Sequence, residues 1–130
     1  LKFGERELGV EKPNTLTLET LMLADINRMI IQNIEKDKIK FENLYKSFFA
    51  DLKNTTIKIF NEKIIISEIS NINPDPATVE LEFRSEEYYV SFWDGYSLAE
   101  TFETQSYKDA LSKYKKYAKK MAKNLRRHQY

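Results

Sequence analysis

The sequence predicts an α+β fold with three parts: an N-terminal helical hairpin, an antiparallel meander of about five strands, and a C-terminal amphipathic basic helix packed on the sheet. Two observations support this prediction. Apolar residues recur at helical spacing before residue 54 and after residue 105, whereas apolar and polar residues alternate between these points. Residues 1–14 contain two Gly and one Pro, so we expect an irregular arm there and a single domain over residues 15–130.

The helical hairpin is predicted from two apolar stripes. The first runs from residue 18 to about residue 36, and Thr15 or Thr17 can act as its N-cap. The second runs from about residue 37 to residue 53. Its apolar residues follow the spacing of one helix face: Phe41, Leu44, Tyr45, Phe48, Phe49 and Leu52. The short junction between the two stripes is typical of antiparallel neighbouring helices.

The strands are predicted from short runs of β-forming residues that lie between turn formers. The runs occupy residues 57–59, 64–66, 79–83, 88–93 and 98–102. Turn formers separate the last three runs at Ser85-Glu86 and at Asp94-Gly95, and the second of these pairs is typical of a two-residue type I′ hairpin. Strands this close together in the chain are expected to pair as antiparallel neighbours.

Two-residue turns at both hairpins would fix which side chains share a face of the sheet. Glu82 would then lie opposite Tyr89, and Tyr89 would lie opposite Glu100 on the next strand. One face becomes an apolar core made of Val79, Leu81, Phe83, Tyr88, Val90 and Phe92. The other face collects the more polar set Glu80, Glu82, Tyr89, Trp93, Tyr96, Leu98 and Glu100.

Aromatic side chains framed by carboxylates suit a protein–protein contact, because rigid rings act as anchors and the acidic frame attracts a basic partner. The predicted partner-binding residues are therefore Glu80, Glu82, Tyr89, Trp93, Tyr96 and Glu100. In the alternative interpretation the C-terminal helix covers this face and places its Lys side chains near the glutamates. The sequence leaves both interpretations open.

The C-terminal segment carries an unusual concentration of positive charge. The net charge of the chain is +1, but residues 106–130 hold nine Lys or Arg and one acidic residue. On a helical wheel the apolar residues of this segment form one stripe and the cations lie opposite. An ordinary solvated face explains this pattern, and so does phosphate binding by Lys108, Lys115, Lys116, Lys119, Lys120, Lys123, Arg126 and Arg127.

Several classes of function are disfavoured. The chain has no Cys, which excludes thiol nucleophiles and Cys-based metal sites and is compatible with the cytoplasm. Its single His, His128, lies near the end of the sequence, and three Gly do not suffice for a phosphate-binding loop. No apolar run approaches the length of about 18 residues that spans a membrane. We expect no catalytic residue, no metal, no cofactor and no membrane contact.

One weak catalytic alternative remains. Pro74-Asp75 together with Glu82 loosely resembles the PD-(D/E)xK nuclease pattern, although Arg84 stands where that pattern has Lys. In this alternative Asp75 and Glu82 would bind a divalent metal. Alternating Glu residues on a strand are more often a solvent-facing surface.

The residues thus predict a small cytoplasmic binding protein that has no enzymatic activity. Its most concrete form is an immunity or antitoxin-like protein of a bacterial or phage conflict system, which would neutralise a basic toxin through the acidic and aromatic face. The alternative is a nucleic-acid-binding accessory protein that uses the basic C-terminal helix.

Overall fold

The computed structural model describes residues 33–128. The predicted arm, residues 1–14, and most of the first predicted helix lie outside this range. Residues 33–36 are helical and a turn at Asp37 follows. The elements beyond the turn are α2 (Lys38–Phe49), β2 (Thr55–Ile59), β3 (Lys63–Glu68), β4 (Thr78–Arg84), β5 (Glu87–Trp93), β6 (Ala99–Thr104) and α3 (Tyr107–Arg127).

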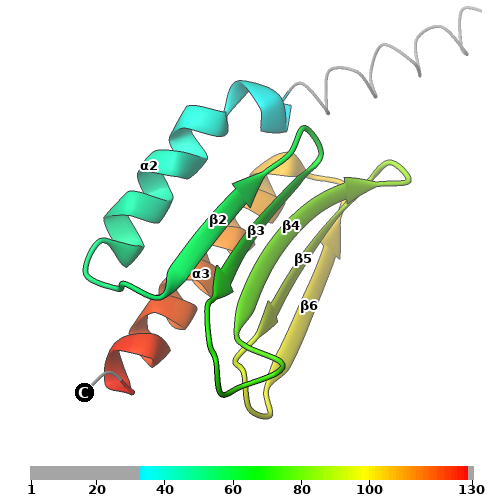
Figure 1. Cartoon of the computed structure of the whole chain (residues 1–130). Helices are drawn as coiled ribbons and strands as arrows, with labels where there is room; N and C mark the ends of the chain where they lie inside the picture. The colour runs from blue at the N-terminus through cyan, green and yellow to red at the C-terminus, as the bar shows by residue number, and fades with distance from the viewer. Residues whose placement is uncertain (1–32, 129–130) are drawn as a thin grey trace, which may run out of the picture. The chain divides into compact units, whose positions relative to one another are not determined.

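The five strands form one antiparallel sheet in the order β2-β3-β4-β5-β6, so the predicted meander is confirmed. Figure 1 shows α2 and α3 on the same side of this sheet. α3 packs against β4, β5 and β6, whereas α2 lies beside α3 and next to β2. The sheet therefore has one face covered by helices, which we call the inner face, and an opposite outer face.

The hydrophobic core lies between the inner face and the helices. Burial alternates strictly along β4 and β5, as expected when one face of a strand is packed and the other is not. Phe92 stacks on Tyr117 of α3 with ring centroids 5.8 Å apart, and Phe41 of α2 meets Tyr114 of α3 edge-on at 5.4 Å. These contacts confirm that the basic C-terminal helix packs on the sheet through its apolar stripe.

Polar contacts fix both ends of α3. The Ser106 side chain caps its start by accepting the Asp109 backbone N–H at 3.1 Å. Near its end, Arg126 donates to both carboxylate oxygens of Asp51, at 2.7 and 2.9 Å, and to the Phe48 carbonyl at 2.5 Å. The Arg126 bond holds the pKa of Asp51 below its ordinary value. None of the helices in residues 33–128 has the length and apolar character needed to cross a membrane.

The first predicted hairpin is confirmed. Ser85 and Glu86 have φ angles of 53° and 65°, the left-handed pair that a two-residue type I′ turn requires. Glu82 pairs with Tyr89 and Thr78 pairs with Trp93, as expected from the sequence. The outer residues of β4 and β5 therefore occupy the predicted positions.

The second predicted hairpin is wrong. Trp93 pairs with Ala99 rather than with Tyr96, so five residues, 94–98, form the loop. The reason is Asp94, whose Oδ1 accepts the backbone N–H groups of Tyr96, Ser97 and Leu98 at 2.8, 2.9 and 3.0 Å. Partial burial works to raise the pKa of Asp94, but these N–H bonds outweigh it and leave the pKa below its ordinary value. A displacement of three residues moves every β6 side chain to the other face.

Candidate functional site

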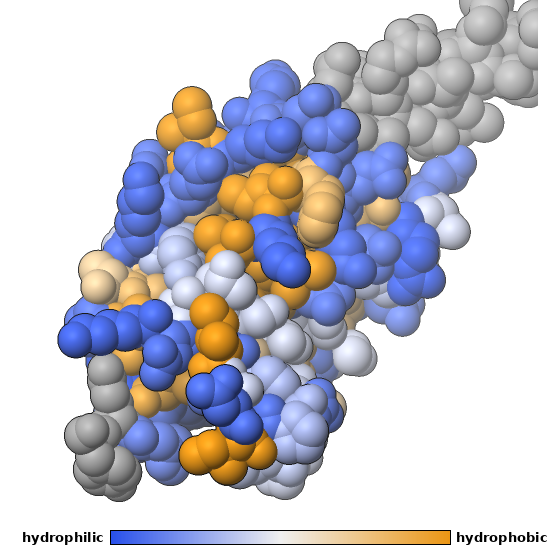
Figure 2. All heavy atoms as spheres, in the orientation of Figure 1, coloured by the Kyte–Doolittle hydropathy of each residue, from blue (hydrophilic) through white to orange (hydrophobic). Residues whose placement is uncertain are grey.

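The outer face of the sheet is the surface on which the sequence places the partner-binding residues. Both described helices lie on the inner face, so the interpretation in which the C-terminal helix covers the outer face is wrong. Figure 2, which views the molecule from this side, shows weakly polar and apolar residues in the middle of the face with hydrophilic residues around them. The side chains on it include Thr56, Lys58, Lys63, Ile65, Ser67, Thr78, Glu80, Glu82, Arg84, Tyr89, Ser91, Trp93, Thr101 and Glu103.

Four of the six predicted partner-binding residues lie on the outer face and two do not. Glu80, Glu82, Tyr89 and Trp93 share it, each partly exposed. Glu100 points to the inner side instead, where its Oε2 accepts a bond from Lys120 Nζ of α3 at 2.5 Å.

Tyr96 lies in the 94–98 loop, 72% exposed, and is the second predicted residue that is absent from the outer face. Both misplacements follow from the changed register of β6. Thr101 and Glu103 take the outer positions, opposite Ser91 and Tyr89.

The outer face is less acidic than predicted, because cations lie next to its glutamates. Lys63 Nζ lies 3.8 Å from Glu80 Oε1, and Arg84 Nε lies 3.5 Å from Glu82 Oε1. The Arg84 guanidinium also lies over the Tyr89 ring, 4.0 Å from its centroid. Exposed ion pairs of this kind contribute at most about 1 kcal/mol each, so a partner's charged groups can replace them at low cost.

The aromatic side chains of the outer face are held in place. The Trp93 indole N–H donates to the Asp75 carbonyl at 2.8 Å, which ties the ring to the loop between β3 and β4. The loop between β3 and β4 is in turn bonded to the 94–98 loop, since Asn73 Nδ2 donates to the Gly95 carbonyl at 2.9 Å. Gly95 has φ +91°, and a Cβ there would meet the Ala77 backbone nitrogen at 3.2 Å. A side chain at position 95 would therefore loosen this arrangement.

A shallow hollow of about 300 Å³ lies beside Tyr89 on the outer face. Polar and charged side chains line most of it, including Glu80, Glu82, Arg84, Ser91 and Glu103. Such a depression can receive a side chain of a protein partner, with carboxylates on two sides of it. The sequence predicts the carboxylates from β4 but not Glu103, which the register of β6 brings here.

The carboxylates of the weak nuclease alternative are not brought together. Asp75 lies in the loop before β4, whereas Glu82 lies four residues beyond the start of that strand and pairs with Tyr89. Four residues of extended strand separate Thr78 from Glu82 by about 13 Å. Within residues 33–128 no group of three potential metal ligands is present.

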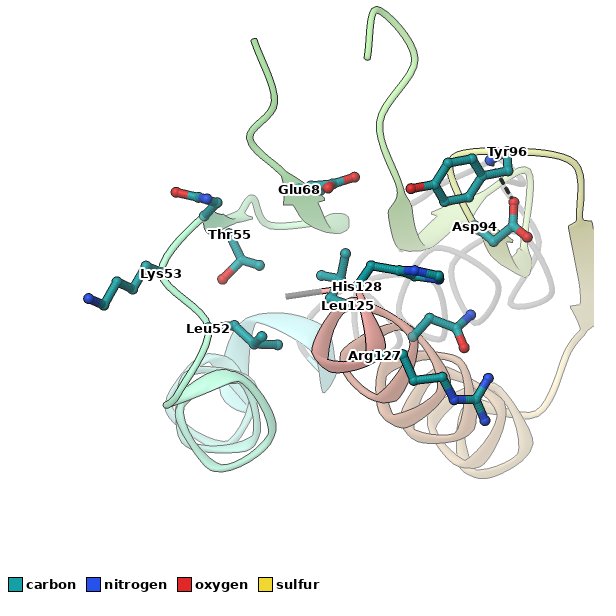
Figure 3. A pocket seen from close by; sticks show the side chains of 11 residues that line it. Leu52, Lys53, Thr55, Glu68, Asp94, Tyr96, Leu125, Arg127 and His128 are labelled. Carbon is teal, nitrogen blue, oxygen red and sulfur yellow. Dashed lines mark hydrogen bonds between the residues drawn. The ribbon is translucent and has the colours of Figure 1, made fainter. Parts of the chain in front are cut away.

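A second hollow, which the sequence does not predict, lies at the end of the sheet (Figure 3). Its volume is about 380 Å³, and we call it the end hollow. Four chain segments contribute to it: the approach to β2, the end of β3, the 94–98 loop and the last turn of α3. It contains the His128 side chain, whose ring lies 5.9 Å from that of Tyr96. Its lining residues are Leu52, Lys53, Asn54, Thr55, Glu68, Asp94, Tyr96, Asn124, Leu125, Arg127 and His128.

All eight cations predicted for phosphate binding are exposed on α3, but they are not equivalent. Lys120 is paired with Glu100, and Arg126 with Asp51. These two side chains hold the helix against the sheet and against the segment after α2. The other six have no carboxylate partner among the described residues.

Comparisons of the chain with protein-family models, with curated proteins and with solved structures gave no match. The geometry of the outer face and of α3 is therefore the basis for a functional proposal.

Proposed function

We propose that this protein is a small cytoplasmic, non-enzymatic binding protein that masks a protein partner with its outer face. One observation carries the proposal: Tyr89 and Trp93 are held in fixed positions on a sheet face that no described element covers. Large rings that are already ordered lose little conformational entropy on binding, which is why Tyr and Trp dominate protein interfaces.

The charges around the rings favour a basic partner. Glu103 has no cationic partner among the described residues, and the pairs of Glu80 and Glu82 are long and partly exposed. A Lys or Arg of the partner can displace Lys63 or Arg84 and form its own ion pair with Glu80 or Glu82. Binding removes water from this surface, which strengthens the new ion pair. The most concrete form of the proposal is an immunity or antitoxin-like protein that neutralises a basic toxin encoded by an adjacent gene.

The test uses two arginine substitutions on opposite sides of the molecule. Ser91 lies in the middle of the outer face between Glu80 and Thr101, and Ser112 is exposed on α3. Ser91→Arg inserts a bulky cation into the proposed interface and leaves the core untouched, whereas Ser112→Arg adds the same side chain elsewhere. We expect calorimetry with the product of the adjacent gene to show at least a 100-fold weaker Kd for Ser91→Arg only. Equal affinities of both variants would refute the proposal.

A further inference from the structure

Six cations on the exposed side of α3 form no ion pair with a carboxylate in the described part of the fold. We call them the cation row: Lys108, Lys115, Lys116, Lys119, Lys123 and Arg127. Lys120 and Arg126, by contrast, form the ion pairs given above. Two lysines of α3 lie over aromatic rings: Lys113 Nζ is 5.0 Å from the Phe102 ring centroid, and Lys119 Nζ of the row is 5.9 Å from that of Phe48. The row extends along a helix of 21 residues, which is about 30 Å long.

The cation row is unfavourable for the isolated fold. Lys115, Lys119 and Lys123 are four residues apart, and like charges at this spacing destabilise a helix. Members that are four residues apart lie about 6 Å from each other. This is within the Debye length of about 8 Å at physiological ionic strength, so salt only partly screens their repulsion. A bound polyanion would remove this repulsion and release the counterions that the row holds.

At the C-terminal end of α3 the row reaches the end hollow, to which Arg127 contributes together with Lys53. The two carboxylates that line the hollow, those of Asp94 and Glu68, already accept hydrogen bonds from backbone N–H groups. Asp94 accepts three N–H groups, and Glu68 Oε1 accepts the Ala77 N–H at 3.2 Å. These bonds partly offset the negative charge of the two carboxylates toward an incoming anion.

An exposed aromatic ring lies at the same end of α3 as Arg127, the last member of the cation row. Tyr96 is 72% exposed, and Figure 3 shows it on the same side of the hollow as Asp94. The His128 ring is its neighbour, with the two ring centroids 5.9 Å apart. An aromatic ring next to a run of cations is the combination on which unpaired bases stack while phosphates follow the positive charge. Bases inside a duplex are not available to such a ring.

We propose that the cation row and the end hollow bind single-stranded nucleic acid, with phosphates along α3 and one base stacked on Tyr96. This activity lies on the side of the molecule opposite the outer face and does not depend on the protein-masking proposal. The contacts are to phosphates and to a base face, so the binding tolerates many sequences.

The test is fluorescence anisotropy of the purified chain with labelled single-stranded DNA and RNA of mixed sequence, titrated between about 50 and 200 mM salt. We expect a log–log salt slope of about −4 if all six cations contact phosphate, because each contributes about −0.7 on a single strand. Replacing both Lys116 and Lys123 by Gln should reduce the magnitude of the slope by about 1.4. Replacing both Lys40 and Lys58 by Gln, on α2 and β2, is the matched control and should leave it unchanged.

A second variant tests the stacking contact. Tyr96→Ala keeps the backbone bonds to Asp94 and every cation, so we expect about tenfold weaker binding with an unchanged salt slope. A double-stranded DNA of the same length is titrated as a further probe. Four outcomes would overturn the proposal: no binding at about 50 mM salt, an unchanged slope in the Lys116/Lys123 variant, an unchanged affinity in Tyr96→Ala, or equal binding of the double-stranded DNA. Binding to vesicles that contain phosphatidylserine, without competition by single strands, would instead assign the row to a membrane surface.

Discussion

Replacing Phe92 by Ala is expected to lower the free energy of unfolding by about 3–5 kcal/mol. Phe92 is 2% exposed near the end of β5 and stacks on Tyr117, so its ring joins the sheet to α3. Its removal leaves a cavity that the neighbouring strands and the helix cannot fill without moving apart. Since small domains have a total stability of about 5–15 kcal/mol, this variant should populate the unfolded state measurably at moderate temperature.

The measurement is urea unfolding followed by circular dichroism, with Tyr114→Phe as the control. Tyr114 is fully buried, its hydroxyl has no hydrogen-bond partner among the described residues, and burial raises the pKa of the phenol. Its conversion to Phe keeps the ring and removes an unsatisfied polar group, so stability should be unchanged or rise by about 1 kcal/mol. A loss below about 1 kcal/mol for Phe92→Ala would contradict the packing of α3 on the sheet.

The second large effect is expected from the pair of substitutions Tyr89→Ala and Glu82→Lys on the outer face. The Tyr89 ring and the Glu82 carboxylate both border the shallow hollow on the outer face. Loss of an anchoring Tyr at the centre of an interface weakens binding by about 2 kcal/mol or more, which is roughly 30-fold. The added Lys repels a basic partner as well, so the double variant should show no measurable binding to the product of the adjacent gene.

The design separates binding from folding. Both positions are only partly buried and neither contributes to the inner face, so the midpoint of urea unfolding should change little. Lys116→Gln on α3 is a control that alters charge away from the outer face and should bind normally. Retention of wild-type affinity by the double variant would show that the partner contacts another surface.

Most of the fold follows from local sequence patterns, because each strand and helix has a clear period of its own. The register predicted for β6 is wrong, because the Asp94-Gly95 pair indicates a turn but does not indicate the length of the loop. The Asp94 carboxylate selects a longer loop by capping three backbone N–H groups. Phe102 is the one large apolar residue in β6. Requiring it to face the core would have given the correct register, in which Phe102 lies opposite Val90 on the inner face.

The candidate site could be predicted only where it lies within one hairpin. Glu80, Glu82, Tyr89 and Trp93 belong to β4 and β5, which a two-residue turn joins. Lys63 reaches Glu80 across the 69–77 loop, and a loop of that length is compatible with many strand registers. The end hollow is harder still to predict, because four segments far apart in the sequence form it.

The most direct test of the outer face as a binding surface is site-specific photo-cross-linking inside cells. A benzoyl-phenylalanine replaces Ser91 in one variant and Ser112 in the other, and the cross-linked products are identified by mass spectrometry. The proposal predicts one dominant protein adduct from position 91, encoded by an adjacent gene, and none of that protein from position 112. Cross-linking of the same protein from position 112 alone, or no adduct from position 91, would contradict it.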